Sequence, residues 1–242
     1  MKTISTALLP QFIDPVVLPE TAAVVIDVLR ASTTITTALA HGAAAVAPCL
    51  TPEEALAWKD QSPKGTVFTG GERKGQLIPG FDCDNSPFSY PEDVVRGKTI
   101  AFTTTNGTRT LHHCLGAREV LIGAFVNRAA LVDHLEKCHS SVVLACAGTN
   151  DQLSGEDILF AGAAIDDLLG LQSGWQIADV QTQMALDFFR ARNSTPESFR
   201  GAFVESRGAQ NLTRLGYLRD IERAMENSLY PFVPVYDPES KR

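Results

Sequence analysis

Apolar runs and amphipathic segments alternate along most of the chain. Runs rich in β-branched residues, such as residues 22–28 and 141–146, are typical of strands buried on both faces of a parallel sheet. The segment 31–41 begins with hydroxyl residues and is followed by Gly42, which is how many helices begin and end. This alternation predicts an α/β fold, a three-layer α/β/α arrangement with a largely parallel or mixed central sheet.

The alternation extends from about residue 20 to residue 170, and a helical C-terminal region follows it. The predicted strands are residues 22–28, 43–49, 66–69, 98–103, 119–125 and 141–146. The predicted helices are residues 31–41, 51–60, 109–115, 128–138, 156–169, 178–192, 196–204 and 210–226. Residues 70–91 are predicted to form a long polar loop, and the proline-bounded segment 230–236 at most an edge strand. We expect one domain over residues 1–242, or two interlocked subdomains over about 1–170 and 171–242.

The composition is that of a folded, acidic protein. Of the 242 residues, 44% are hydrophobic and 20% are charged, which excludes a disordered or low-complexity chain. The 28 acidic and 21 basic residues give a formal net charge of -7. Because phosphate backbones require a basic face, we expect no nucleic-acid partner. A small anion held by a few local cations is compatible with this charge.

The cysteines and the apolar segments favour a cytoplasmic protein. The five cysteines occur singly and without any Cys-x-x-Cys pair, as reduced and buried thiols do. Residues 1–10 lack the long apolar region and cleavage site of a secretory signal, and no apolar run approaches the roughly 20 residues of a membrane span. We therefore expect no membrane association. The sequence leaves open whether the chain forms a homo-oligomer such as a dimer.

Three of the apolar strands end in polar turns that precede helices. Ligands of open α/β sheets bind at the carboxyl ends of strands, and helix N-termini offer free N–H groups to phosphate or carboxylate. We therefore predict an anion site there, with helix capping as the alternative role of the same residues. The candidate substrate-binding residues of these turns are Ser32, Thr33, Thr104, Thr105, Asn106, Gly107, Thr108, Arg109, Cys146 and Gly148.

Asp27 stands inside an otherwise apolar strand, where a buried carboxylate is costly unless a cation or metal accompanies it. Arg30 follows three residues later and leaves two alternatives open. In one, Asp27 and Arg30 form a structural ion pair. In the other, Asp27 is a metal-binding or catalytic carboxylate and Arg30 clamps an anion.

The long polar segment and the start of the helix over 156–169 supply further candidates. Residues 72–74, an acid and two bases, lie between glycines, which let a backbone approach a ligand closely. Residues 80–87 offer carboxylate and amide oxygens, the ligands that Mg²⁺ prefers. Solvated turns are the alternative for both stretches, and helix-dipole partners are the alternative for the acids at 156 and 157. The candidates are Glu72, Arg73, Lys74, Asp82, Asn85, Ser86, Glu156 and Asp157.

Five ordered motifs resemble those of the 2-phosphosulfolactate phosphatase (ComB-like) family. They are residues 25–34 (VIDVLRASTT), 71–73 (GER), 85–87 (NSP), 104–108 (TTNGT), and the stretch from Cys146-Ala147-Gly148 to Glu156-Asp157. The resemblance runs from about residue 20 to 170 and continues weakly through residues 215–217, 220–221 and 233–234. It has two departures, because Asp84 stands where relatives usually carry glycine and Asn227-Ser228 where they tend to carry aspartate.

The resemblance implies a Mg²⁺-dependent phosphatase that hydrolyses 2-phospho-3-sulfolactate to 3-sulfolactate and phosphate, a step of coenzyme M biosynthesis. On this hypothesis Arg30 neutralises developing charge, and the helix N-termini at 32–33 and 106–108 bind phosphoryl oxygens. The metal ligands are then Asp27 together with Glu72, Asp82, Glu156 or Asp157. The candidates for the second anionic group of the substrate are Arg73, Lys74 and Arg109.

Two other functions remain open at this point. One is a non-catalytic small-anion-binding protein on the same scaffold. The other is a hydrolase that depends on Cys146, which is less favoured because Cys146 ends an apolar strand and has no nearby histidine in the sequence. The two departures from the family pattern bear on the identity of the substrate more than on the reaction class.

Overall fold

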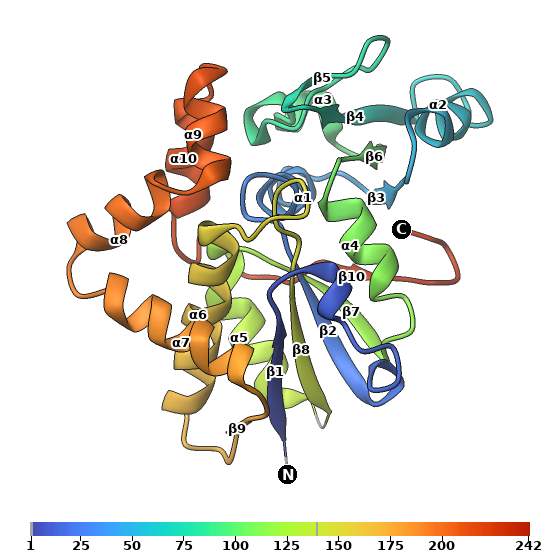
Figure 1. The fold of residues 1–242 in the computed structure, drawn as a ribbon. Coiled ribbons are helices and arrows are strands. Elements are labelled where there is room, and N and C mark those ends of the chain that lie inside the picture. The colour runs from blue at the N-terminus through green and yellow to red at the C-terminus, as the bar shows by residue number, and fades with distance from the viewer. Residues whose placement is uncertain (1, 139) are drawn as a thin grey trace.

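Two β-sheets form the framework of the computed structural model, which describes residues 2–138 and 140–242 (Figure 1). The six-stranded sheet has the order β10-β7-β2-β8-β1-β9, and the four-stranded sheet has the order β3-β6-β4-β5. Neighbouring strands are parallel, except that β10 is antiparallel to β7 and β5 to β4. The strands are β1 (Thr3–Ala7), β2 (Thr21–Ile26), β3 (Ala45–Pro48), β4 (Val67–Arg73), β5 (Gln76–Leu77), β6 (Thr99–Thr103), β7 (Glu119–Gly123), β8 (Ser141–Cys146), β9 (Gln176–Ile177) and β10 (Val235–Tyr236).

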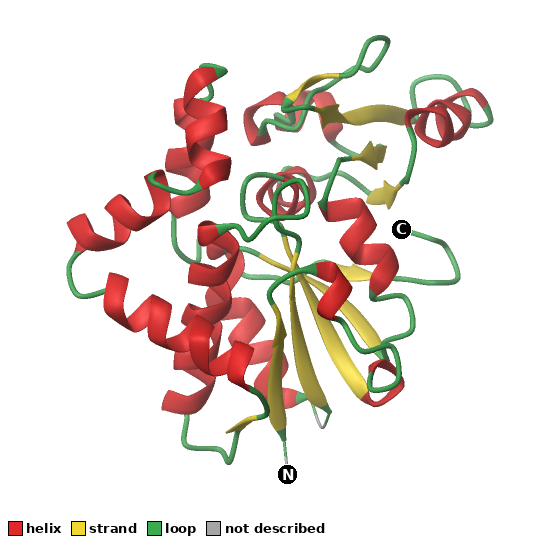
Figure 2. Cartoon of the chain, viewed as in Figure 1, coloured by secondary structure: helices red, strands yellow, loops and turns green. Residues whose placement is uncertain are grey.

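Helices cover both faces of the larger sheet (Figure 2). In Figure 1, α5, α6 and α7 lie on one side of it and α4 on the other, while α1 lies between the two sheets. The α-helices are α1 (Ala31–Ala40), α2 (Pro52–Asp60), α3 (Glu92–Val95), α4 (Gly107–His113), α5 (Arg128–Lys137), α6 (Gly155–Gly170), α7 (Val180–Arg192), α8 (Pro196–Val204), α9 (Arg207–Arg214) and α10 (Leu218–Met225). The prediction of an α/β fold with a largely parallel sheet and a helical C-terminal region is confirmed.

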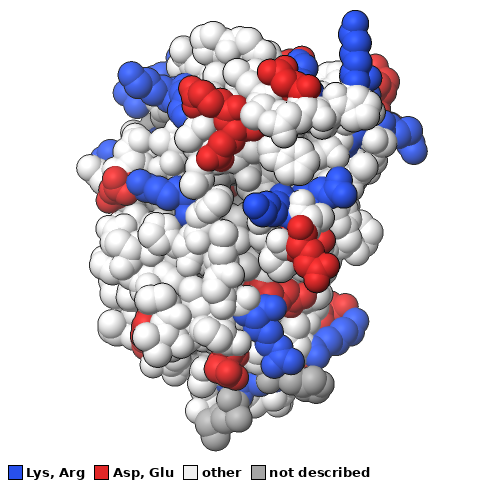
Figure 3. Space-filling model, turned by 90° about the vertical axis from the view of Figure 1, so that its right-hand side faces the viewer, with Lys and Arg blue, Asp and Glu red and all other residues white. Residues whose placement is uncertain are grey.

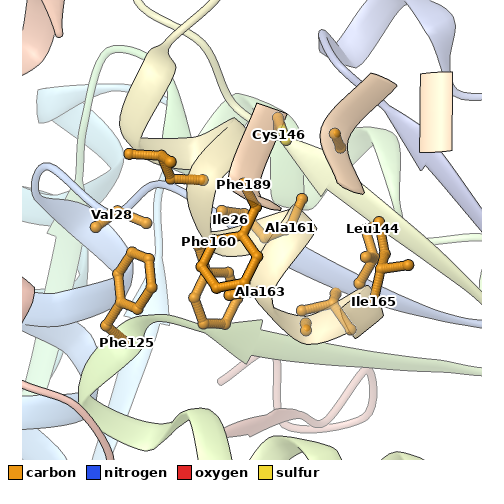
Figure 4. Packing of buried hydrophobic residues seen from close by; sticks show 14 of the residues in the cluster. Ile26, Val28, Phe125, Leu144, Cys146, Phe160, Ala161, Ala163, Ile165 and Phe189 are labelled. Carbon is orange, nitrogen blue, oxygen red and sulfur yellow. The ribbon is translucent and has the colours of Figure 1, made fainter. Parts of the chain in front are cut away.

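The central strand β2 is apolar along its whole length because both of its faces are buried. Val24 and Ile26 belong to the core shared with α6 and α7, whereas Ala23 and Val25 belong to the core on the opposite face. Successive side chains of a strand point to opposite faces, so both sets of positions must be apolar. Figure 4 shows part of the first core, where side chains of α6 and α7 pack against those of β2 and β8.

Two sequence-based expectations are wrong in detail, and one strand was not predicted. The strand that was not predicted is β1 (Thr3–Ala7), which lies between β8 and β9. Three of its five residues carry hydroxyl groups and two of its positions are only partly buried, so its sequence lacks the apolar run of a buried strand. The segment 70–91 is not one long loop, because β4 extends to Arg73 and β5 pairs back onto it. The single helix predicted over 210–226 is two helices, which are separated at Gly216, where φ is +87°. The edge-strand prediction for 230–236 is confirmed by β10.

The cysteines are unpaired, as expected, and four of the five are buried. Among the described residues, no helix is both long and apolar enough to cross a membrane. On the face that Figure 3 presents, basic and acidic side chains are interspersed between larger uncharged areas.

Candidate active site

A pocket lies where polar segments that follow strands of both sheets meet helix α9. Asp27 follows β2, Glu72 lies near the end of β4, and the segments after β6 and β8 complete one wall. The residues that line the pocket are Asp27, Leu29, Arg30, Glu72, Lys74, Gly75, Asn85, Thr105, Asn106, Thr149, Asn150, Gly208, Asn211 and Leu212. The predicted convergence of polar strand ends is therefore present, although its members come from both sheets.

Four carboxylates, those of Asp27, Glu72, Glu156 and Asp157, are gathered at this pocket or directly behind it. Burial raises the pKa of Asp27 to about 7, and the charges of Glu72 and Glu156 contribute to that rise. Burial also raises the pKa of Glu156. The pKa of Asp157 is raised well above its usual value by burial and by the charges of Glu156 and Asp27. Buried carboxylates this close to one another are stable only with bound protons or a cation.

Two of these carboxylates already fix the surrounding backbone. Asp157 accepts hydrogen bonds from the N–H of Val28 at 2.9 Å and of Gly148 at 3.0 Å, which joins the ends of β2 and β8. Glu72 accepts hydrogen bonds from the N–H of Thr105 at 2.8 Å and of Gly75 at 2.7 Å. The pocket wall is therefore held in place by acids, and Gly148, a predicted site residue, contributes its backbone to this arrangement.

Arg30 forms an ion pair with a different acid from the one considered in the sequence. Its guanidinium donates to Asp220 at 2.7 Å and to the carbonyl oxygen of Gly75 at 2.9 Å, and it stacks on the ring of Tyr217 at 4.3 Å. The alternative of a structural Asp27–Arg30 ion pair is thus wrong, because Asp220 takes that role from the C-terminal region. Arg30 remains at the pocket with its side chain only 2% exposed.

The residues around Asn85 form a second polar network that supports Arg30. Ser86 donates its hydroxyl hydrogen bond to Asp220 at 2.8 Å. The Tyr217 hydroxyl donates to Asp84 at 2.7 Å, and Ser89 donates to the same carboxylate at 2.6 Å. Asp84, one of the two departures from the family pattern, therefore positions the ring on which Arg30 stacks.

Helix α1 begins beside Asp27, but its hydroxyl groups are used within the chain. The Ser32 hydroxyl accepts a hydrogen bond from the N–H of Asp27 at 2.9 Å, and Thr33 donates to the carbonyl oxygen of Val28 at 2.8 Å. The N–H of Ala31 donates to the Asp27 carboxylate at 3.3 Å. The structure therefore places Ser32 and Thr33 behind Asp27 rather than in the lining of the pocket.

The turn between β6 and α4 contains residues that line the pocket and residues that are buried behind it. Thr105 and Asn106 line the pocket, whereas Thr104 and Thr108 are buried and hydrogen-bond to each other. At Gly107, an added Cβ would lie 2.7 Å from a carboxylate oxygen of Asp27. Only glycine therefore lets the start of α4 approach Asp27 this closely.

Three charged candidates from the sequence lie away from the pocket lining. The first is Asp82, whose carboxylate forms an ion pair with Lys59 at 2.7 Å and accepts a hydrogen bond from the hydroxyl of Thr69. Arg73 donates to backbone oxygens and to the hydroxyl of Thr103. Arg109 forms a partly exposed ion pair with Asp151 at 2.6 Å. Of the cations considered for a second anionic group, Lys74 is the one that lines the pocket.

Cys146 lies at the end of β8 and is fully buried. Burial, together with the charges of Asp157 and Glu156, raises the pKa of its thiol well above the usual range. Since the thiolate is the nucleophilic form, this environment opposes a role for Cys146 as a nucleophile.

Residues of α9 and α10 belong to the site although the pattern of the sequence did not indicate them. Gly208 and Asn211 of α9 line the pocket, and Asp220 of α10 holds Arg30. Thr149 and Asn150 also line the pocket, and they belong to the polar turn after β8 that the sequence had indicated. The family resemblance at residues 215–217 and 220–221 was the signal that could have found Tyr217 and Asp220. Another cavity, of about 290 Å³, lies between α1 and β10 and is mostly apolar.

The donor atoms at the pocket fit a hard divalent cation such as Mg²⁺. Within the described residues, a carboxylate oxygen of Glu156 and the amide oxygen of Asn85 are buried without a hydrogen-bond partner. Asp27, Glu72 and Asn85 line the pocket and supply the oxygen ligands that Mg²⁺ prefers, and the charge of Glu156 lies close to Asp27 behind the lining. The acids do not form a set of three whose ligand atoms all lie within 4.8 Å of one another, as far as the described chain shows. Mg²⁺ is often bound by one or two carboxylates, water and substrate phosphate, so a closed cage is not required.

The comparisons with known proteins agree on one family. The family model described as 2-phosphosulpholactate phosphatase matches residues 8–239. A protein of Symbiobacterium thermophilum named probable 2-phosphosulfolactate phosphatase is 42% identical over 214 residues, which is 88% of this chain and 90% of the relative. Proteins with the same name from Carboxydothermus hydrogenoformans and Thermotoga maritima are 41% and 39% identical, each over 88% of this chain, and over 85% and 87% of the relatives.

Proposed function

The chain belongs to the 2-phosphosulpholactate phosphatase family, and we propose that it is a Mg²⁺-dependent phosphatase that hydrolyses the phosphate monoester of a small anionic 2-hydroxy acid. The proposed reaction is hydrolysis of 2-phospho-3-sulfolactate to 3-sulfolactate and phosphate, as in coenzyme M biosynthesis. The observation that carries the proposal is the carboxylate of Asp27, which lines the pocket beside Arg30 and whose pKa is raised to about 7 by burial and by neighbouring acids. The names of the relatives support the substrate.

The cation site of the proposal is built from hard oxygen donors. Asp27 and Glu72 would hold Mg²⁺ at the pocket with the amide oxygen of Asn85, and Glu156 and Asp157 would add negative charge behind them. When bound, the metal supplies a positive charge that stabilises the developing charge of the phosphoryl group.

The remaining groups of the pocket bind and orient an anionic substrate. Arg30 is fixed by Asp220 and Tyr217, so it offers a positive charge to phosphoryl oxygens without having to be ordered during the reaction. Lys74 is the candidate for the second anionic group, the sulfonate or carboxylate. It also borders an adjoining depression of about 580 Å³ with Arg207 and Arg214, so further positive charge lies along the approach to the pocket.

We also place the reaction in the cytoplasm. The support for this is the set of five free cysteines, none of which forms a disulfide among the described residues. Free thiols persist in reducing compartments.

The test is phosphate release from 2-phospho-3-sulfolactate and from other phosphorylated hydroxy acids, with Mg²⁺ and with a chelator. We expect turnover only with Mg²⁺, and we expect Asp27→Asn to lower it by roughly 10²–10³-fold, as loss of a transition-state electrostatic group does. Asp82→Asn is the matched comparison, because Asp82 is an acid held by Lys59 outside the pocket lining. It should retain most of the activity.

The other outcomes identify the alternative functions. Binding of phosphate or 3-sulfolactate without any turnover would indicate a non-catalytic anion-binding protein. Turnover that is abolished in Cys146→Ala while Asp27→Asn remains active would indicate a thiol-dependent hydrolase.

A further inference from the structure

We propose that Glu119, His134 and Cys138 form a second metal site, suited to a borderline divalent cation such as Zn²⁺. One ligand atom from each of these residues lies within 4.8 Å of the other two. Glu119 begins β7, His134 lies in the last turn of α5, and Cys138 directly follows that helix. The pocket of Asp27 lies at the carboxyl end of β2, which is parallel to β7, so this cluster lies at the opposite end of the sheet.

Two of the three distances within the cluster are close to those of a tetrahedral zinc site. The Nε2 atom of His134 lies 3.0 Å from the Oε2 atom of Glu119, and the Sγ atom of Cys138 lies 3.7 Å from the same oxygen. Tetrahedral geometry with metal–ligand bonds of about 2.0–2.3 Å separates nitrogen from oxygen by roughly 3.3 Å and sulfur from oxygen by roughly 3.5 Å. The third pair, the ligand atoms of His134 and Cys138, lies within 4.8 Å, so all three atoms can face one ion.

The types of ligand select the class of metal. A thiolate, an imidazole and a carboxylate form a set that binds Zn²⁺ and similar cations, whereas Mg²⁺ prefers oxygen alone. His134 and Cys138 are four residues apart, which places both on one side of the end of α5. The thiolate and the carboxylate carry two negative charges between them, which balance the divalent ion.

The cluster is accessible to an incoming ion. The side chains of His134 and Glu119 are 33% and 28% exposed, so solvent can reach the cluster and a water molecule can take the fourth position. Glu119 and Cys138 also border an open depression of about 610 Å³, which Arg118 and Lys137 share. Without a metal, the same contacts amount to a hydrogen-bonded His–Glu pair with a weak thiol hydrogen bond, and this is the alternative that an experiment must exclude.

The experiment uses Co²⁺ as a spectroscopic substitute for Zn²⁺, added to the full chain in excess Mg²⁺ under reducing conditions. The wild type should bind stoichiometric Co²⁺ with a thiolate-to-metal charge-transfer absorption, and Zn²⁺ should displace it. Cys138→Ser should lose this absorption. His134→Gln should bind at least 10-fold more weakly, because even an outer-shell partner of a metal typically contributes 10–100-fold. The exposed His113→Gln is the matched control and should bind as the wild type does.

Each opposite result overturns the proposal. These are a wild type without charge-transfer absorption, an absorption that persists in Cys138→Ser, and equal affinity in His134→Gln. Circular dichroism before metal addition confirms that each variant is folded. If Cys138→Ser does not fold, the wild-type spectrum and the affinity of His134→Gln still decide the question. Phosphatase activity in Mg²⁺ is a separate readout, so failure of this site leaves the proposed function untouched.

Discussion

The guanidinium of Arg30 is fixed on three sides by groups from distant parts of the chain. Asp220 binds it by an ion pair, Gly75 accepts a hydrogen bond from it, and Tyr217 lies under its plane. The side chains of Arg30 and Asp220 are 2% and 3% exposed, so water cannot replace either partner. Removal of one charge would leave the other buried and unpaired, which is the most costly way to break an ion pair.

Asp220→Asn should therefore destabilise the protein and impair catalysis. Loss of one partner of a buried ion pair lowers the free energy of unfolding by about 3–5 kcal/mol. Because asparagine has nearly the same shape as aspartate, we expect a loss toward the lower end of this range. The matched control is Asp151→Asn, which breaks the Arg109–Asp151 pair, whose side chains are 41% and 66% exposed. Exposed pairs contribute about 0–1 kcal/mol. Urea denaturation of both variants measures the difference, and equal losses would contradict the structural role given to Asp220.

Single residues show which parts of the site can be predicted from a sequence. Asp27 could be identified because a carboxylate in an apolar strand is a local signal with a known cost. Asp82 was a candidate for another reason, because it lies in a polar stretch of carboxylate and amide side chains, and the sequence does not show that Lys59 binds it outside the pocket. The local pattern gave no such signal at Asp220, because it lies 190 residues from Arg30 and its role depends on contacts between distant parts of the chain.

Among the elements, α9 lies against the acid cluster at Gly208, where the helix approaches Glu156 very closely. An added Cβ at Gly208 would lie 2.1 Å from a carboxylate oxygen of Glu156 and 3.4 Å from the Cβ of Leu29. The carboxylate of Glu156 is buried, so it has little room to move aside. A side chain at residue 208 must therefore displace either the acid cluster or the helix.

Gly208→Ala should lower both stability and activity. Overpacking typically costs about 1–3 kcal/mol, and displacement of Glu156 disturbs the proposed cation site. Gly201→Ala in α8 is the matched control, because an added Cβ there meets nothing within 4 Å. Alanine in place of a helical glycine should stabilise the protein by roughly 0.5–1 kcal/mol. Thermal denaturation and turnover distinguish the two variants, and a Gly208→Ala variant that behaves like Gly201→Ala would contradict the close approach of α9.

Elements with a clear pattern of apolar residues were predicted from the sequence, and elements in which that pattern is weak were not. β2, β8 and α6 are apolar enough for periodicity alone to locate them. β1 was missed because hydroxyl residues occupy its partly exposed positions, and the break between α9 and α10 depends on one glycine. Because α9 lies in that ambiguous region, its contribution to the pocket could not be predicted.

At the scale of the whole molecule, the acid cluster ties stability to pH. Asp27 is buried next to the charges of Glu72 on β4 and Glu156 on α6, and its pKa is raised from 3.8 to about 7. Between pH 3.8 and about pH 7, Asp27 therefore keeps its proton in the folded protein but has released it in the unfolded chain. The stability gained in this way is fully present below about pH 4 and is lost as the pH rises through about 7.

In the absence of metal, Asp27→Asn should therefore stabilise the protein at pH 7–8, by an amount on the order of a few kcal/mol. The variant should show little advantage at pH 4, and added Mg²⁺ should narrow the difference at pH 8 by stabilising the wild type. Denaturation in a chelator across this range, for both proteins, measures the effect.

Asp82→Asn provides a control of opposite sign. Burial alone would raise the pKa of Asp82, but the hydrogen bonds from Lys59 and Thr69 outweigh it and lower the pKa. Asp82 therefore stabilises the folded state above its unfolded pKa, and that contribution is lost as the pH falls through the folded value. Asp82→Asn should accordingly destabilise the protein at neutral pH, where Asp27→Asn stabilises it. If both substitutions destabilise the metal-free protein at pH 8, Asp27 is not under the electrostatic strain that makes it a candidate for binding a cation.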